Sequence, residues 1–167
     1  MIFKNITKNF YISLTIVTLI FILDRISKIY VIYLANSNIG SDIFTSAYLN
    51  ITLIWNKGIA FGLFSFDKNY LYNLLSALIV AIILILIVMV FKNQGLKRYP
   101  LLFIIGGAFG NLYDRIFYSG VPDFIDLHIG EFHWFIFNVA DIFITFGVIF
   151  MILYELIVTS DSQHEKN

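Results

Sequence analysis

The chain has no cysteine and few charged residues. Only 13% of its 167 residues are charged, whereas about one-quarter are charged in an ordinary soluble domain. The lack of cysteine excludes disulfides, thiolate metal ligands, a cysteine nucleophile and attachment of lipid to a cysteine of this chain. Its 11 basic and 11 acidic residues cancel, so no net field favours nucleic acid as a partner.

Hydrophobic residues make up 59% of the sequence, and the mean hydropathy is +0.84. Four stretches reach the length of about 20 apolar residues that a helix needs to cross a bilayer. The first is too long for a signal peptide and has no small-residue cleavage site, so we expect it to be retained. We predict one all-α polytopic membrane domain over residues 1–167, with spans at Phe10–Leu34, Leu71–Phe91, Pro100–Phe117 and Phe135–Val158 and a disordered tail at 159–167.

Lysine and arginine counts at the ends of the predicted spans indicate the orientation. Six of the 11 basic residues flank the termini and the loop Lys92–Tyr99, which we predict to be cytoplasmic. Two longer loops, Ala35–Tyr70 and Tyr118–Trp134, then face outward. Tyr48–Trp55 is rich in β-branched and aromatic residues, which predicts a strand. Both loops are unusually apolar, so we expect them to cover the outer helix ends at the membrane surface.

Polar side chains recur within three of these spans, always near the outer end. Placing an aspartate, lysine or arginine near a helix centre costs about 2.5 to 3.5 kcal/mol, and such residues normally face a protein interior and mark a site. Because residues three or four apart share a helix face, each span presents one polar patch. The patches are Asp24 with Lys28, Asn111 with Asp114 and Arg115, and Asn138 with Asp141, the last about 9 Å below the start of its span.

Some of these residues have structural explanations. Asp24 and Lys28 could form an ion pair, and Arg115 could connect a carboxylate, a carbonyl and a loop. Gly106 and Gly110 form a GxxxG pattern, which favours close helix packing.

Asp123 and Asp141 are the two acids that this pattern leaves without a cation. Two carboxylates held close together in a desolvated site share a proton and titrate as a pair. The ionised member can take a proton from water while the protonated one donates to a carbonyl, as in aspartic peptidases.

Metal and serine chemistry fit the sequence less well. His128, His133 and His164 lack the HExxH spacing of zinc peptidases. We therefore expect no metal and no cofactor, and we predict that His133 is an interfacial side chain beside Trp134. Neither Ser27 nor Ser76 has a suitably placed base.

Two other functions remain open at this point. A small ion-coupled transporter could carry membrane carboxylates, although its acids would be expected near the midplane of repeated helices. A non-catalytic membrane assembly subunit would explain the spans and covering loops, but it would not explain two acids without cations.

Five motifs resemble those of lipoprotein signal peptidase, also called signal peptidase II, in the same order and over nearly the whole chain. They are DRISK (Asp24–Lys28), NKGIAFG (Asn56–Gly62), GGAFGNLYDR (Gly106–Arg115), VPDFID (Val121–Asp126) and FNVAD (Phe137–Asp141). The resemblance implies four transmembrane helices with a small extracytoplasmic β-cradle and a short interfacial helix. The sequence departs from the family pattern at Arg25, Pro122 and Ile142.

The resemblance also implies an activity and a site. The family members are aspartic peptidases of the bacterial inner membrane that cleave prolipoproteins before a diacylglyceryl-cysteine. A monomer that works in membrane lipid and is inhibited by globomycin-type lipopeptides is expected. By motif position, Asp123 and Asp141 are the catalytic pair, and the binding or supporting residues are Asn56, Gly58, Asn111, Arg115, Asn138, Asp24, Lys28, Gly107 and Asp114.

Overall fold

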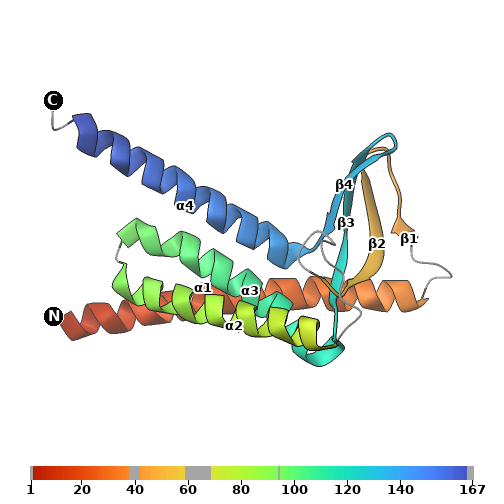
Figure 1. Cartoon of the computed structure of the whole chain (residues 1–167), viewed down its shortest axis with the longest axis horizontal. Helices are drawn as coiled ribbons and strands as arrows, with labels where there is room; N and C mark the ends of the chain where they lie inside the picture. Colours follow the sequence, from red (N-terminus) through yellow and green to blue (C-terminus); the bar gives the residue numbers. More distant parts are fainter. Residues whose placement is uncertain (1, 38–41, 59–68, 94, 165–167) are drawn as a thin grey trace.

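The computed structural model consists mostly of long helices, with a small antiparallel sheet at one end (Figure 1). It describes residues 2–37, 42–58, 69–93 and 95–164. The first turns of α1 and the last turns of α4 both lie at the end opposite the sheet (Figure 1). The elements are α1 (Ile2–Ser37), β1 (Asp42–Phe44), β2 (Leu49–Asn56), α2 (Asn69–Lys92), η2 (Gly95–Lys97), α3 (Arg98–Tyr118), β3 (Val121–Ile129), β4 (Phe132–Phe137) and α4 (Val139–His164).

Three of the described helices are long and apolar enough to cross a membrane: α1 over Asn9–Ser37, α2 over Tyr72–Lys92 and α4 over Val139–Val158. Most of their side chains point outward rather than into the protein, as expected for helices surrounded by lipid. The predicted span in α3 does not meet this criterion, because its glycines and polar residues lower its hydropathy. The count of four spans is therefore not confirmed by composition.

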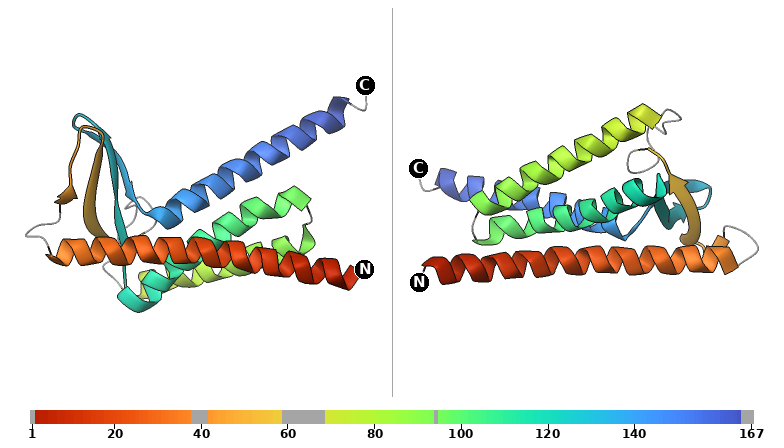
Figure 2. Two further views of the ribbon diagram at one scale, coloured as in Figure 1. Left: turned by 180° about the vertical axis from the view of Figure 1, so that it is seen from behind. Right: turned by 90° about the horizontal axis from the view of Figure 1, so that it is seen from below.

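α3 is the central helix and contacts each of the other three (Figures 1 and 2). Its glycines let the neighbouring helices approach closely. A Cβ atom at Gly106 would lie 2.8 Å from the Cβ of Ile20 in α1, and one at Gly110 would collide with the carboxylate of Asp24. A Cβ at Gly107 would collide with the backbone carbonyl of Ala140 in α4. The prediction that the GxxxG pattern serves helix packing is confirmed.

The four strands form a sheet of order β1-β2-β3-β4 with antiparallel neighbours. The sheet stands across the ends of the helices, and α1 extends past its base (Figures 1 and 2). β2 confirms the strand predicted at Tyr48–Trp55, displaced by one residue. β2 and β3 place Ile54 opposite Asp123 and Asn56 opposite Val121. Asn56 and Asp123 are therefore brought to the same end of the sheet.

Two predicted boundaries in the C-terminal third were wrong. Phe135 does not begin a span, because Phe132–Phe137 pairs with β3 as strand β4 and the helix starts only at Val139. Asp141 therefore lies in the first turn of α4 and not about two turns inside it. α4 also continues to His164 where a disordered tail was predicted from Thr159, because residues 159–164 contain no proline or glycine to end the helix.

The expected short interfacial helix is absent from the described part of the first loop, residues 42–58. Residues 59–68, which include Ile59–Gly62 of the NKGIAFG motif, lie outside the described residues.

Gly107→Ala tests the packing of α3 against α4. We expect a loss of about 1 to 3 kcal/mol in the free energy of unfolding, because the new methyl group meets the backbone of Ala140 and the side chain of Ile144. Thermal unfolding in detergent measures the change. Gly120→Ala is the matched control, since its Cβ would lie 3.5 Å from Trp55 in ordinary contact. Equal unfolding midpoints for the two variants would contradict the packing argument.

Candidate active site

Asp123, the third residue of β3, is buried, with only 3% of its surface exposed. Its two oxygens accept hydrogen bonds from two carboxamides. Asn56 Nδ2 donates to Oδ2 at 2.8 Å, and Asn138 Nδ2 donates to Oδ1 at 2.6 Å. The carboxylate is therefore held by neutral donors from β2 and from the segment before α4.

Asp141 is part of a reciprocal cap at the start of α4. Asn138 Oδ1 accepts from the backbone N–H of Asp141 at 3.2 Å, and Asp141 Oδ2 accepts from the backbone N–H of Asn138 at 3.1 Å. This is the capping-box pattern, which satisfies two backbone donors at a helix N-terminus. Asp141 Oδ1 also accepts from Asn111 Nδ2 at 2.8 Å. The predicted pairing of Asn138 with Asp141 is thus a cap as well as a shared face.

Asn138 connects the two acids, because its side chain donates to Asp123 and its backbone donates to Asp141. Burial, followed by the nearby charge of Asp141, raises the pKa of Asp123 from 3.8 to about 6. Among the described residues neither carboxylate has an ion pair. The two acids that the sequence left without a cation are therefore brought together without one.

A cluster of buried charges lies behind these acids, between α1 and α3. Lys28 Nζ lies 3.0 Å from Asp24 Oδ1 and 2.7 Å from Asp114 Oδ2. Arg25 also binds both acids, with its Nη2 2.8 Å from Asp24 Oδ2 and 2.7 Å from Asp114 Oδ2. Asp24 Oδ1 in turn accepts from the backbone N–H of Ala140 at 3.0 Å. The cluster therefore fixes the start of α4 from a different helix.

Lys28 sets the orientation of the Asn111 carboxamide. Its Nζ donates to Asn111 Oδ1 at 2.9 Å, so the opposite side of the carboxamide, Nδ2, is turned to Asp141. An ion pair between Asp24 and Lys28 was one alternative left open by the sequence, and it is present. The cluster is also connected to Asp141 through one intervening side chain, that of Asn111.

Arg115 supports the backbone next to the site and does not bind the acids. Its Nη2 donates to the carbonyl of Gly58 at 2.8 Å, and its Nη1 donates to the carbonyl of Asn111 at 3.2 Å. Gly58 also donates its N–H to Asn56 Oδ1 at 2.8 Å, which turns Asn56 Nδ2 toward Asp123. Arg115 therefore connects α3 with the first loop, as the sequence suggested.

A cavity of about 340 Å³ opens beside Asp141, between β4 and α4. Its wall is almost entirely apolar, and Asp141 is the one acid in it. The lining residues are Leu127, Trp134, Phe135, Phe137, Asp141, Ile142, Thr145, Phe146 and Ile149. A larger cavity of about 380 Å³ lies among α2, α3 and α4 at the far end, and it contains none of the predicted site residues.

All eleven predicted site residues lie on or around the half of α3 nearest the sheet. Only some of their interactions were predicted. From the sequence, Arg25 was named only as a departure from the family pattern, and its contacts with both Asp24 and Asp114 were not predicted. The signal was its position on α1 next to Asp24 and three residues before Lys28. Gly107 is part of the site only by packing against α4.

Proteins of one known family match this chain over most of its length. A family model described as signal peptidase (SPase) II matches residues 16–157. A lipoprotein signal peptidase of Pelagibacter ubique is 54% identical over 160 residues, which cover 96% of each chain. One from Anaplasma phagocytophilum is 43% identical over 150 residues, covering 87% of this chain and 92% of the relative. The chain belongs to the signal peptidase II family.

Solved structures agree with this family assignment. Two structures of bacterial membrane enzymes, determined by the in meso method, each match with a TM-score of 0.69. They are 28% and 30% identical and cover 89% and 86% of this chain, and 90% and 92% of their own chains. The resemblance inferred from the five motifs is confirmed. As a signal peptidase II family member with apolar helices, the chain is a peptidase of the bacterial inner membrane.

Lys28→Met tests the buried charge cluster. We expect a loss of about 3 kcal/mol in the free energy of unfolding, because Asp24 and Asp114 keep their burial but lose one of their two cations. Unfolding of the purified protein in mixed micelles measures the loss. Lys97→Met is the matched control, since its 3.9 Å contact with Glu155 is exposed and contributes about 1 kcal/mol or less. A loss no larger than that of the control would contradict the structural role of Lys28.

Proposed function

We propose that this protein is an aspartic endopeptidase that removes the signal peptide from prolipoproteins, cleaving before a diacylglyceryl-modified cysteine. One observation carries the proposal. Two buried carboxylates, Asp123 and Asp141, share the donor Asn138, and Asp141 lines an apolar cavity. The names of the relatives, lipoprotein signal peptidase, supply the class of substrate.

The surroundings of the two acids favour different roles. Asp141 lies in the first turn of α4 and accepts a bond from the Asn138 backbone, and a helix N-terminus favours the anion. Asp123 lies in a strand and not at a helix N-terminus, and burial raises its pKa to about 6, so we assign the shared proton to Asp123. Asp141 then takes a proton from water as the water oxygen attacks the scissile carbonyl carbon, and Asp123 donates its proton to the carbonyl oxygen.

Collapse of the tetrahedral intermediate completes the reaction. The hydroxyl that Asp123 protonated returns its proton to Asp123 as the C=O bond re-forms. The C–N bond breaks, and the leaving amine takes the proton from Asp141. Both acids thus regain their starting states. Asn56, Asn111 and Asn138 keep the acids in place throughout, while Arg115 and Gly58 fix the backbone along which the substrate lies.

The cavity suits an apolar substrate. A signal peptide is an apolar helix and diacylglyceryl chains belong in the bilayer, so the scissile bond lies close to the membrane interface. The cavity volume of about 340 Å³ falls within the usual range for ligand sites. Its aromatic wall is suited to acyl chains or apolar side chains near the bond, and globomycin-type lipopeptides would compete for the same surface.

The proposed arrangement in the membrane has four spans, with α3 as the fourth. Its polar residues bind partners in α1, α4 and the first loop. They are therefore not exposed to lipid, although they lower the hydropathy of the helix. Both termini are cytoplasmic and the sheet is extracytoplasmic, so the acids lie near the outer face. The protein acts as a monomer, because each residue of the proposed mechanism comes from one chain.

Asp123→Asn and Asp141→Asn test the proposed pair. Each substitution removes one proton carrier, so we expect cleavage of a diacylglyceryl-modified prolipoprotein to fall by about a thousandfold or more. The measurement is the conversion of purified substrate in mixed micelles, followed by gel mobility and mass spectrometry of the product. Asp42→Asn, an exposed acid of the same sheet, is the control and should retain the normal rate. Normal cleavage by either variant of the pair would refute the assignment.

The pH dependence tests which acid holds the proton. The pKa of Asp123 is raised to about 6, so its protonated form is present below that pH and lost above it. We expect kcat/KM, which reports the free enzyme, to decline as pH rises through about 6, approaching about tenfold per unit. Initial rates between pH 4 and 9 measure this. A kcat/KM that rises steadily from pH 5 to 8 would show that Asp123 acts in its ionised form.

A further inference from the structure

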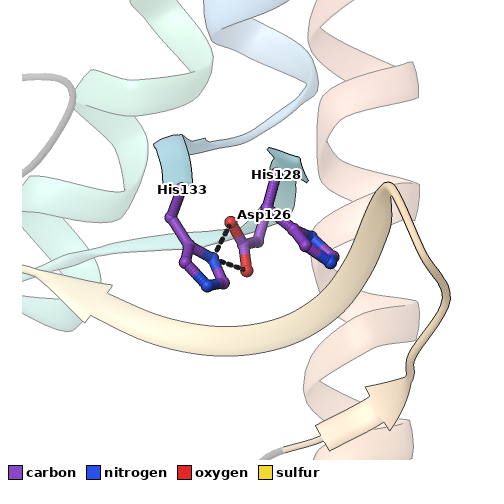
Figure 3. A group of neighbouring side chains, drawn as sticks. All are labelled: Asp126, His128 and His133. Atoms are coloured by element: carbon purple, nitrogen blue, oxygen red, sulfur yellow. Dashed lines mark hydrogen bonds and ion pairs between the residues drawn. The ribbon is translucent and has the colours of Figure 1, made fainter. Parts of the chain in front are cut away.

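A second group of polar residues lies on the sheet and has no part in the proposed mechanism. Asp126 and His128 belong to β3 and His133 belongs to β4 (Figure 3). His128 and His133 are directly opposite each other in the strand register, and Asp126 is two residues from His128. The register shifts between Asp126 and His128, so strand alternation does not decide which way these side chains face. Their ligand atoms nevertheless gather at one place on the β3–β4 hairpin.

The three side chains are close enough to share one ion. One ligand atom from each, a carboxylate oxygen and two ring nitrogens, lies within 4.8 Å of the others. His133 Nδ1 lies 3.0 Å from Asp126 Oδ1 and 2.9 Å from Oδ2 (Figure 3). In a tetrahedral zinc site with bonds of about 2.0 to 2.2 Å, neighbouring ligand atoms are about 3.4 Å apart. Ligand atoms as far apart as 4.8 Å must therefore approach one another by roughly 1.4 Å to bind one ion.

The environment of the group favours a cation. Asp126 is buried, and Asn50 Nδ2 donates a hydrogen bond to its carboxylate at 3.2 Å. His128 Nδ1 is buried and has no hydrogen-bond partner in the described structure, which is unfavourable for a buried polar atom. A bound metal ion would give a ring nitrogen of His128 a partner, and it would place a positive charge beside the carboxylate of Asp126.

The histidine rings must rotate to bind one ion. They are stacked, with centroids 4.9 Å apart and an interplanar angle of 18°. Because nitrogen lone pairs lie in the ring plane, stacked rings do not direct both at one point. The His133 side chain is 51% exposed, so its ring can turn toward an ion without displacing a buried side chain.

We propose that Asp126, His128 and His133 form a three-ligand site for a divalent transition metal of the zinc class. Two imidazoles and a carboxylate are ligands that Zn²⁺ accepts, with water as the fourth. The ion would connect β3, which carries Asp123, to β4, which leads to the cap of α4 at Asn138. The site is distinct from the peptidase site and does not depend on the proposed function.

Zinc binding by the full-length protein without a histidine tag tests the proposal. After treatment with a chelator, the protein in detergent is titrated with Zn²⁺ by calorimetry, and Co²⁺ absorption reports the ligand set. We expect one Zn²⁺ per chain. His128→Gln, His133→Gln and Asp126→Asn should each weaken binding about tenfold or more.

His164→Gln is the matched control, because His164 ends α4 at the far end of the molecule (Figure 1). It should leave the affinity unchanged. Because His133 is half-exposed, His133→Gln is expected to keep its fold. Zn²⁺ binds the folded wild type, so it should raise the unfolding midpoint of the wild type but not that of His133→Gln. No zinc uptake by the wild type, or uptake that survives both His128→Gln and His133→Gln, would overturn the proposal.

Discussion

The start of α4 is the point on which the site depends. A helix N-terminus exposes backbone N–H groups that have no partner within the helix, and in an apolar setting each must be satisfied by protein. Asn138 and Asp141 satisfy two of them reciprocally, and Asp24 satisfies the N–H of Ala140 from another helix. The cap places Asp141 at the end of the helix, where its anion is favoured. The requirement for a cap and the requirement for a reactive acid are met by the same residue.

Behind this cap the polar residues are arranged in layers of decreasing charge. Arg25 and Lys28 neutralise Asp24 and Asp114 between α1 and α3. Next comes a layer of carboxamides, one of which, Asn111, is oriented by Lys28. Only then come the proposed catalytic acids, which meet neutral donors. A cation bonded to Asp123 would hold it ionised, whereas carboxamides satisfy its oxygens and leave its pKa high.

Close packing makes these layers possible. Gly107 and Gly110 bring α3 so near to α4 and α1 that a methyl group would meet Ala140 or Asp24. The same approach excludes water and lipid from the charged cluster, which strengthens its internal interactions. It also explains why α3 is the least apolar of the four long helices although it lies at their centre: its neighbours, and not lipid, surround its polar face.

The sequence by itself determined the long helices, the strand near Trp55, and the set of polar residues, because apolar runs and shared helix faces are local patterns. It also determined the family, through five ordered motifs. The tertiary structure decided which carboxylates received cations and which received carboxamides, because the partners lie far apart in the chain: Asp114 and Arg25, or Asp123 and Asn56. It decided where α4 begins, since β4 forms only by pairing with β3. It likewise brought His128 and His133 face to face, because strand register, and not spacing in the sequence, places residues opposite one another.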